Sequence, residues 1–284
     1  MLLKSISYWA FPGGLEGTLD IPTFMRKAKQ HRFEAVELCI GEGGELGLDT
    51  GEARCREILA EAGRAGVKVA SCASGVYWSY ALASESAEDR RRAEEALRKM
   101  ARIAGWLEVR ALLTIPGAVD VFFDPAAPVI PYDVVLERAR EGLARVLPTA
   151  ADCGVTLAIE NVWNKFLLSP AEMATFIDGF GSPAVGAYVD VANMMPYGYP
   201  EQWLRILGKR VAGIHFKDFR VAVGTADGFV DLLEGDVNWP AVMDAIAAIG
   251  YEGPVVAEMI PLYRHYPEVR IANTSNAMDA ILGR

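Results

Sequence analysis

The sequence is poor in cysteine and contains no long apolar segment. Its 4 cysteines form no CxxC pair and no zinc-finger spacing, so we expect buried, reduced thiols and no disulfide framework. No apolar run reaches the roughly 18 residues of a membrane span, and Pro12 and Gly13 break the N-terminal apolar stretch early. We therefore expect no signal peptide, no association with a membrane and a cytoplasmic location.

Positive charge is also scarce. The chain has 28 Lys and Arg against 37 Asp and Glu, which gives a formal net charge of −9 at pH 7. Proteins that bind nucleic acid or anionic membrane surfaces neutralise phosphates with basic side chains. The acidic balance therefore makes nucleic acid and membranes poor partners. Hydrophobic residues, in contrast, make up 52% of the chain, which excludes wholesale disorder and predicts a large buried core.

Short apolar runs rich in β-branched residues alternate with longer segments that carry apolar residues at helical spacing. The predicted strands are Leu3–Tyr8, Ala35–Ile40, Val67–Ser74, Leu112–Thr114, Thr156–Glu160, Val185–Asp190, Val211–Phe216 and Pro254–Glu258. The predicted helices are Thr18–His31, Thr50–Ala65, Ala87–Trp106, Tyr132–Ala151, Ser169–Gly179, Glu201–Leu207, Trp239–Ile249 and Pro267–Leu282.

This alternation indicates parallel strands that are covered by helices. Eight strand–helix units in 284 residues match the size of a (β/α)₈ TIM barrel, which typically takes about 250 residues. A doubly wound open sheet is the rival architecture, but the first turn lacks its G-x-G-x-x-G spacing. We therefore predict an α/β protein with a single domain, a (β/α)₈ barrel over residues 1–284.

The last four predicted strands share one feature: each is apolar up to a residue at its end, or next to its end for Val211–Phe216, that can bind a metal. These residues are Glu160, Asp190, His215 and Glu258. The C-terminal ends of the strands form the active site of such barrels. Three carboxylates at one mouth would repel one another unless a cation lay between them. We therefore predict one divalent cation held by these four residues, of the Mn, Mg or Co kind, with Zn also open.

Other polar and aromatic residues fall near the same predicted mouth. Trp163 can stack on the apolar face of a sugar ring, while Asn193, Lys217 and Arg220 can orient hydroxyl groups. We predict that these four contact the substrate, although a solvated loop position explains any one of Asn193, Lys217 and Arg220 equally well, and Trp163 could simply cover the barrel end. Glu37 lies inside the predicted strand Ala35–Ile40 and points either into the barrel or into a salt bridge.

Four segments carry a resemblance to a known family: AIENVWNKFLLSP, AYVDVANM, GIHFKDF and LLEGDVNWPAVMDAI, the last followed by IGYEGPVVAEM. In combination they resemble the xylose-isomerase-like barrels, a group that includes sugar isomerases, ketose 3-epimerases and apurinic endonucleases. The resemblance covers nearly the whole chain. It implies that Glu160, Asp190, His215 and Glu258 are metal ligands, as in the tagatose-type 3-epimerases, and that Glu160 and Glu258 are also the catalytic acid and base.

The sequence departs from that group at two positions. Asn193 stands where those epimerases usually carry a histidine, and Phe166 stands where they carry a further glutamate. The substrate pocket is therefore expected to differ from theirs in detail. The endonucleases need additional histidines on early strands for a three-metal cluster, and the second to fourth predicted strands contain none.

The resemblance implies a metal-dependent 3-epimerase or isomerase that acts on a ketose or ketose phosphate. Such an enzyme abstracts a proton and passes through a metal-stabilised enediolate. Glu160 and Glu258 end strands that lie about 135° apart around an eight-stranded ring, so they would face the substrate from different sides. A sugar or inosose dehydratase of the same fold remains an alternative, and an apurinic endonuclease or a non-catalytic carbohydrate-binding barrel is more remote. The implied partner is a small sugar or sugar phosphate, and the resemblance leaves a homodimer or homotetramer open.

Overall fold

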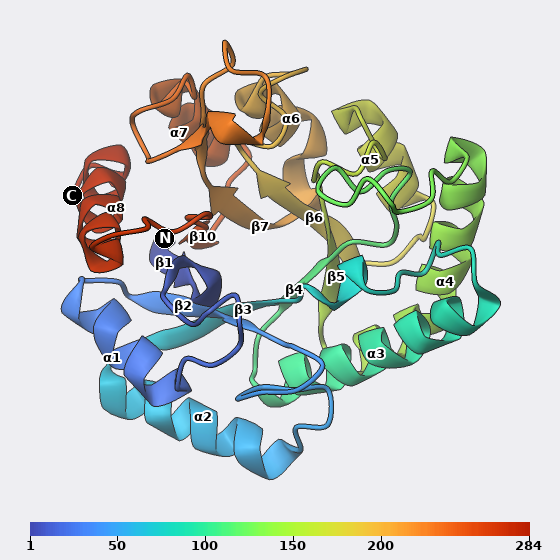
Figure 1. Cartoon of the computed structure of the whole chain (residues 1–284), viewed down its shortest axis with the longest axis horizontal. Coiled ribbons are helices and arrows are strands. Elements are labelled where there is room, and N and C mark those ends of the chain that lie inside the picture. The colour runs from blue at the N-terminus through green and yellow to red at the C-terminus, as the bar shows by residue number, and fades with distance from the viewer.

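The computed structural model describes every residue from Met1 to Arg284, and its centre is a closed barrel of eight parallel strands. Figure 1 shows the strands inside a ring of helices. The barrel strands are β1 (Leu2–Ser7), β2 (Ala35–Cys39), β3 (Lys68–Ala73), β4 (Ala111–Thr114), β5 (Thr156–Glu160), β6 (Val185–Asp190), β7 (Val211–Phe216) and β10 (Gly253–Ala257). Neighbours in sequence are neighbours in the barrel, and β10 closes it against β1. The predicted (β/α)₈ barrel is confirmed.

Helices follow the strands and form the outer layer. They are α1 (Ile21–Gln30), α2 (Glu52–Ala65), α3 (Ala87–Trp106), α4 (Tyr132–Asp152), α5 (Pro170–Asp178), α6 (Pro200–Leu207), α7 (Trp239–Ala248) and α8 (Pro267–Leu282). Two of them, α1 and α5, begin later than the apolar pattern predicts, because the side chains of Asp20 and Ser169 cap them. Asp20, for example, accepts a hydrogen bond from the backbone N–H of Thr23 (2.8 Å), so α1 begins at Ile21 and not at Thr18.

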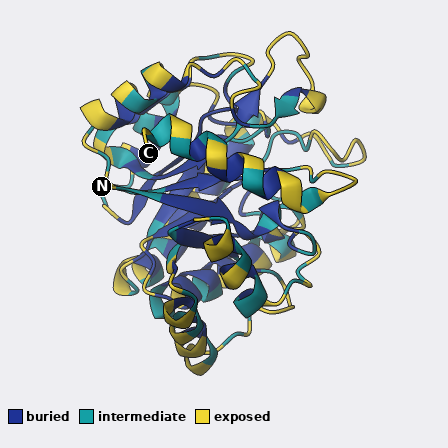
Figure 2. Ribbon diagram, turned by 90° about the vertical axis from the view of Figure 1, so that its left-hand side faces the viewer, coloured by how far each residue is buried: buried dark blue, intermediate teal, exposed yellow.

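The core lies between the barrel and the helices and inside the barrel itself. All six residues of β6 are buried, as are all four residues of β4. Figure 2 shows buried strands at the centre and helices whose outward faces are exposed. This pattern is what near-continuous apolar strands and amphipathic helices produce when helices cover a parallel sheet. None of the helices has the length and apolar character needed to cross a membrane.

One small element was not predicted from the sequence. After β7 the chain forms a two-stranded antiparallel ribbon of β8 (Asp218–Phe219) and β9 (Phe229–Val230). The carboxylate of Asp218 holds the base of this ribbon, because it accepts hydrogen bonds from the backbone N–H of Leu233 (2.9 Å) and the indole Nε1–H of Trp239 (3.0 Å). Asp218 therefore orders the long segment between β7 and α7.

Candidate functional site

The four residues predicted at the strand ends lie together at one mouth of the barrel. Glu160 and Asp190 are the last residues of β5 and β6, His215 is the penultimate residue of β7, and Glu258 directly follows β10. Each offers one ligand atom, and these atoms all lie within 4.8 Å of one another. All four residues are buried. The parallel arrangement explains the convergence, because strands that run in one direction end at the same rim.

The imidazole of His215 directs Nδ1 toward the carboxylates. Nδ1 lies 3.2 Å from Oε1 of Glu160, 3.7 Å from Oε2 of Glu258 and 4.0 Å from Oδ2 of Asp190. The ring packs against Tyr188, with a centroid separation of 4.6 Å. One ring nitrogen thus faces three acidic groups that come from three different strand ends.

Lys217 adds a positive charge to this cluster. Its ammonium group contacts the carboxylate of Glu258 and lies 3.4 Å from Oδ2 of Asp190. Burial alone would lower the pKa of Lys217, but the charges of Glu258 and Asp190 outweigh that effect and raise it above its ordinary value. Lys217 therefore stays charged and offsets part of the negative charge of the cluster.

The two glutamates differ in their surroundings. Burial raises the pKa of Glu160 to about 7, even though its hydrogen bond to His215 acts in the opposite direction. Burial acts the same way on Glu258, but there the charges of Lys217 and His215 outweigh it and lower the pKa. The environment therefore separates the pKa values of two side chains that are chemically identical.

Asp190 carries a buried oxygen that accepts no hydrogen bond. Its Oδ1 accepts hydrogen bonds from the backbone N–H groups of Ala192 (2.8 Å) and Asn193 (2.9 Å), whereas the buried Oδ2 accepts none. The Lys217 ammonium lies 3.4 Å from Oδ2 without donating to it, and burial of a carboxylate oxygen that accepts no hydrogen bond is costly. A cation among the ligand atoms would satisfy it, and three carboxylates with one imidazole are a donor set that suits a divalent metal. The residues present therefore fit a divalent metal ion.

A cavity of about 370 Å³ opens directly above the cluster. Its polar side chains include Glu160, Asn193, Lys217 and Glu258. Much of the wall is aromatic, made by Trp9, Trp78, Phe122, Phe123, Trp163 and Phe229. The combination of an apolar, aromatic wall and a few convergent polar groups is typical of a small-molecule site.

Three of the four predicted substrate contacts line this cavity, and the fourth does not. Trp163 also donates from Nε1 to the backbone oxygen of Asn193 (2.8 Å), which ties two of the lining residues together. Arg220 instead donates from Nε to the backbone oxygen of Glu234 (2.9 Å), and its exposed side chain lies outside the cavity. The β8–β9 ribbon turns the chain away just after Phe219, so nearness to Lys217 in sequence does not bring Arg220 to the site.

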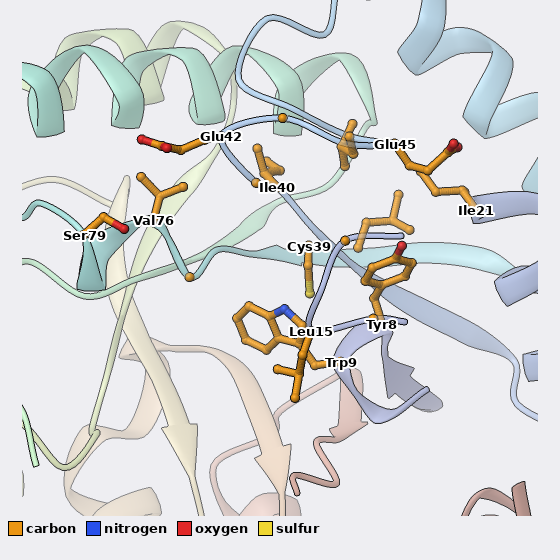
Figure 3. A pocket seen from close by; sticks show the side chains of 17 residues that line it. Tyr8, Trp9, Leu15, Ile21, Cys39, Ile40, Glu42, Glu45, Val76 and Ser79 are labelled. Atoms are coloured by element: carbon orange, nitrogen blue, oxygen red, sulfur yellow. The ribbon is translucent and has the colours of Figure 1, made fainter. Parts of the chain in front are cut away.

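A second cavity of about 290 Å³ adjoins the first and shares Trp9, Leu15 and Gly75 with it. Figure 3 shows Trp9 and Leu15 on one side of it and Ile40 and Val76 on another. No Lys, Arg or His lines this second cavity. It therefore offers an extension of the site that combines apolar side chains with the carboxylates of Glu42 and Glu45 and lacks a cationic side chain that would pair with a phosphate.

Two further neighbours of the cluster, Asn161 and Glu37, are not among the predicted site residues. Asn161 fixes the end of β6, because its side chain donates to the backbone oxygen of Asp190 (2.8 Å) and accepts from its N–H (2.9 Å). Glu37, whose direction the sequence left open, points into the barrel and contacts His215 Nε2 (3.0 Å). The available signals were an asparagine directly after Glu160 and a charged residue within an apolar strand, which needs a buried partner.

Replacement of Lys217 by methionine tests whether its positive charge stabilises the buried carboxylates of the cluster. In the metal-free protein, Lys217→Met leaves the carboxylates of Glu258 and Asp190 without their ammonium partner, so we expect the free energy of unfolding to fall by about 3–5 kcal/mol. The measurement is denaturant unfolding of chelator-treated protein. Lys165→Met, which removes an exposed ion pair with Asp120, is the matched control and should cost less than about 1 kcal/mol. An equal free energy of unfolding for Lys217→Met and the unsubstituted protein would show that the Lys217 ammonium does not stabilise these carboxylates.

The comparisons with known proteins agree with this geometry. A family model described as "Xylose isomerase-like TIM barrel" matches residues 25–276. The chain is 27% identical over 248 residues to "Putative L-ribulose-5-phosphate 3-epimerase SgbU" of Escherichia coli (strain K12), across 85% of this chain and 84% of that protein.

Solved structures with the same fold include two sugar epimerases. A D-psicose 3-epimerase from Clostridium cellulolyticum H10 superposes with a TM-score of 0.80 at 16% identity, over 99% of this chain and 98% of its own. The 3-keto-D-glucoside 4-epimerase YcjR from E. coli gives a TM-score of 0.77 at 14% identity, over 99% of this chain and 100% of its own. At these identities the likeness establishes the fold.

Proposed function

The chain belongs to the xylose isomerase-like TIM-barrel family, and we propose that it is a divalent-metal-dependent sugar 3-epimerase or isomerase. The substrate class is a ketose or a ketose phosphate. The observation that carries the proposal is the buried cluster of Glu160, Asp190, His215 and Glu258 beneath an aromatic-walled cavity. The names of the sugar epimerases to which the chain is similar support the same reaction class.

Glu160, Asp190, His215 and Glu258 would hold the cation, which we propose to be Mn²⁺, Mg²⁺ or Co²⁺, with Zn²⁺ also compatible with the donor set. The buried Oδ2 of Asp190, which accepts no hydrogen bond, supports this assignment. When bound, the cation would supply a Lewis acid for the carbonyl and neighbouring hydroxyl oxygens of the sugar. Asp190 and His215 serve only as ligands in this proposal, because the two glutamates have a second task.

The two glutamates move the proton. Epimerisation at C3 needs a base on one face of that carbon and an acid on the other. Glu160 ends β5 and Glu258 follows β10, and β6 and β7 separate these strands in the barrel. The two carboxyl groups therefore approach the cavity from different sides, and each exchanges a proton with its own face of C3.

The cavity walls orient the sugar. Trp163 provides a ring against which the apolar face of a sugar can stack. Asn193 donates from Nδ2 to the backbone oxygen of Asn161 (3.0 Å), which leaves its Oδ1 to accept a hydrogen bond from a hydroxyl group. Lys217 lies on the cavity floor beside Glu258 and holds that carboxylate in place.

Turnover in heavy water tests the proposal. The metal-loaded protein is incubated with a panel of free ketoses and the corresponding ketose phosphates, and the position of deuterium in each product is read by NMR. Label at C3 of an epimeric product is the expected result. Label only at C1 or C2 indicates aldose–ketose isomerisation, and an unsaturated or deoxy product indicates a dehydratase. An absence of exchange with every substrate, in protein of verified metal content, would contradict an enzymatic role.

A further inference from the structure

Glu37 lies in the middle of β2, and its side chain is fully buried (0% exposed). A carboxylate in such a place is costly unless it is paired and hydrogen-bonded. The acidic cluster already described does not include it. Its position therefore needs an explanation of its own.

Three side chains surround the Glu37 carboxylate. Tyr188 donates from its hydroxyl to Oε2 (2.7 Å), and Ser71 donates from Oγ to the same oxygen (2.8 Å). Oε1 lies 3.0 Å from Nε2 of His215. The four residues come from β2, β3, β6 and β7 and are all 0% exposed, so the network crosses the inside of the barrel. A carboxylate with three partners is fully satisfied there.

The direction of these hydrogen bonds follows from the chemistry of the groups. An ionised carboxylate only accepts, so the nitrogen that contacts Glu37 must donate. Nε2 of His215 therefore carries a proton. A metal ligand must be an unprotonated ring nitrogen, so a bound metal would displace the proton of Nδ1, the nitrogen that faces Glu160, Asp190 and Glu258, while Nε2 keeps its proton toward Glu37.

The barrel has local irregularities where this network forms. The register between β2 and β3 shifts between Val36 and Glu37, and the register between β6 and β7 shifts between Ala187 and Tyr188. Such irregularities redirect side chains relative to a regular strand and recur beside active sites. Both members of the Glu37–Tyr188 pair thus follow directly after such a shift.

We propose that Glu37 is a positioning residue: through Nε2 it fixes the ring and the tautomer of His215, so that Nδ1 is presented to the metal. Tyr188 and Ser71 hold the Glu37 carboxylate in turn. This inference rests on the proposed function, because it assigns Nδ1 a metal to bind. Groups that orient a metal-binding histidine in this way typically contribute 10–100-fold to metal affinity.

The test measures Mn²⁺ affinity by calorimetry on the full chain after removal of metal by a chelator. Glu37→Gln is expected to weaken binding by about 10–100-fold. The matched control is Glu94→Gln, which removes a buried carboxylate on α3 that pairs with Arg98 and Arg145, away from the site. It should leave Mn²⁺ affinity unchanged. If Glu37→Gln does not fold, Glu37→Asp carries the same expectation, because it draws the carboxylate back from Nε2 while keeping its charge.

Two further readouts separate positioning from a merely structural role. The visible absorption spectrum of the Co²⁺-loaded protein reports the geometry of the ligands, and we expect it to change in Glu37→Gln but not in Glu94→Gln. In a His215→Asn background, Glu37→Gln should weaken Mn²⁺ binding no further, because its route to the metal is gone.

Three results would overturn the inference. One is a folded Glu37→Gln or Glu37→Asp protein with unchanged Mn²⁺ affinity and Co²⁺ spectrum, which would leave the proposed function intact. Another is equal weakening by Glu94→Gln. The third is an unsubstituted protein that binds no divalent metal, and it would remove the proposed function at the same time.

Discussion

Glu258→Gln is expected to lower the rate of epimerisation by about 10²–10⁴-fold, the usual contribution of a general acid or base. Glutamine has nearly the shape of glutamate, but it neither accepts nor releases a proton at neutral pH. Glu160 also lines the cavity, and in the proposed mechanism it still serves the other face of C3. We therefore expect deuterium exchange at C3 of one epimer to survive better than the formation of the opposite epimer. Both rates are measured by NMR in heavy water.

The control for this substitution flanks the same strand, β10, at its other end. Glu252→Gln makes the same change just before β10, at the opposite end of the barrel, where the exposed carboxylate only contacts the N-terminal amine. It should leave the rate unchanged. Because an amide is also a poorer metal ligand than a carboxylate, bound metal is determined in each sample. Full epimerisation by a metal-loaded Glu258→Gln protein would remove Glu258 from the mechanism.

The barrel and the four strand-end residues were predictable because the information is local. An apolar run that ends in Glu160 or Asp190 specifies a buried strand and, in a parallel barrel, also the rim at which its last side chain lies. Helix ends were less predictable. The apolar pattern does not mark the capping side chain, and α1 begins where Asp20 caps it.

The remaining parts of the site depend on contacts between distant segments. Glu37 and His215 are 178 residues apart, and each meets the other only after the barrel closes. The register shift beside Glu37 also disturbs the regular alternation of faces from which a side chain's direction is inferred. Arg220 illustrates the converse, since the ribbon held by Asp218 carries it away from a cavity that its neighbour Lys217 lines. Sequence proximity was therefore a poor guide wherever a long-range hydrogen bond decides the path of the chain.

Asp190→Asn is expected to abolish tight metal binding while the local fold is kept. Oδ1 holds the turn after β6 through the N–H groups of Ala192 and Asn193, and asparagine keeps an oxygen for both. The Oδ2 position becomes an amide NH₂, which donates hydrogen bonds and does not bind a cation. Loss of a direct ligand should exceed the about 10–100-fold loss of affinity that follows removal of an orienting partner. Epimerase activity should fall in parallel with bound metal.

The response to added metal distinguishes Asp190→Asn from Glu258→Gln. Asp190 only holds the cation in the proposed mechanism, so a large excess of Mn²⁺ should restore part of the activity of Asp190→Asn. The same excess should not restore Glu258→Gln, which lacks a proton-transfer group. Without metal, Asp190→Asn should unfold at the same temperature as the unsubstituted protein or higher, because one of three clustered carboxylates is gone and Lys217 still pairs with Glu258. Unchanged Mn²⁺ affinity of Asp190→Asn in calorimetry would show that the cluster does not form the metal site. An Asp190→Asn protein that is inactive at full metal occupancy would show that Asp190 takes a direct part in the chemistry.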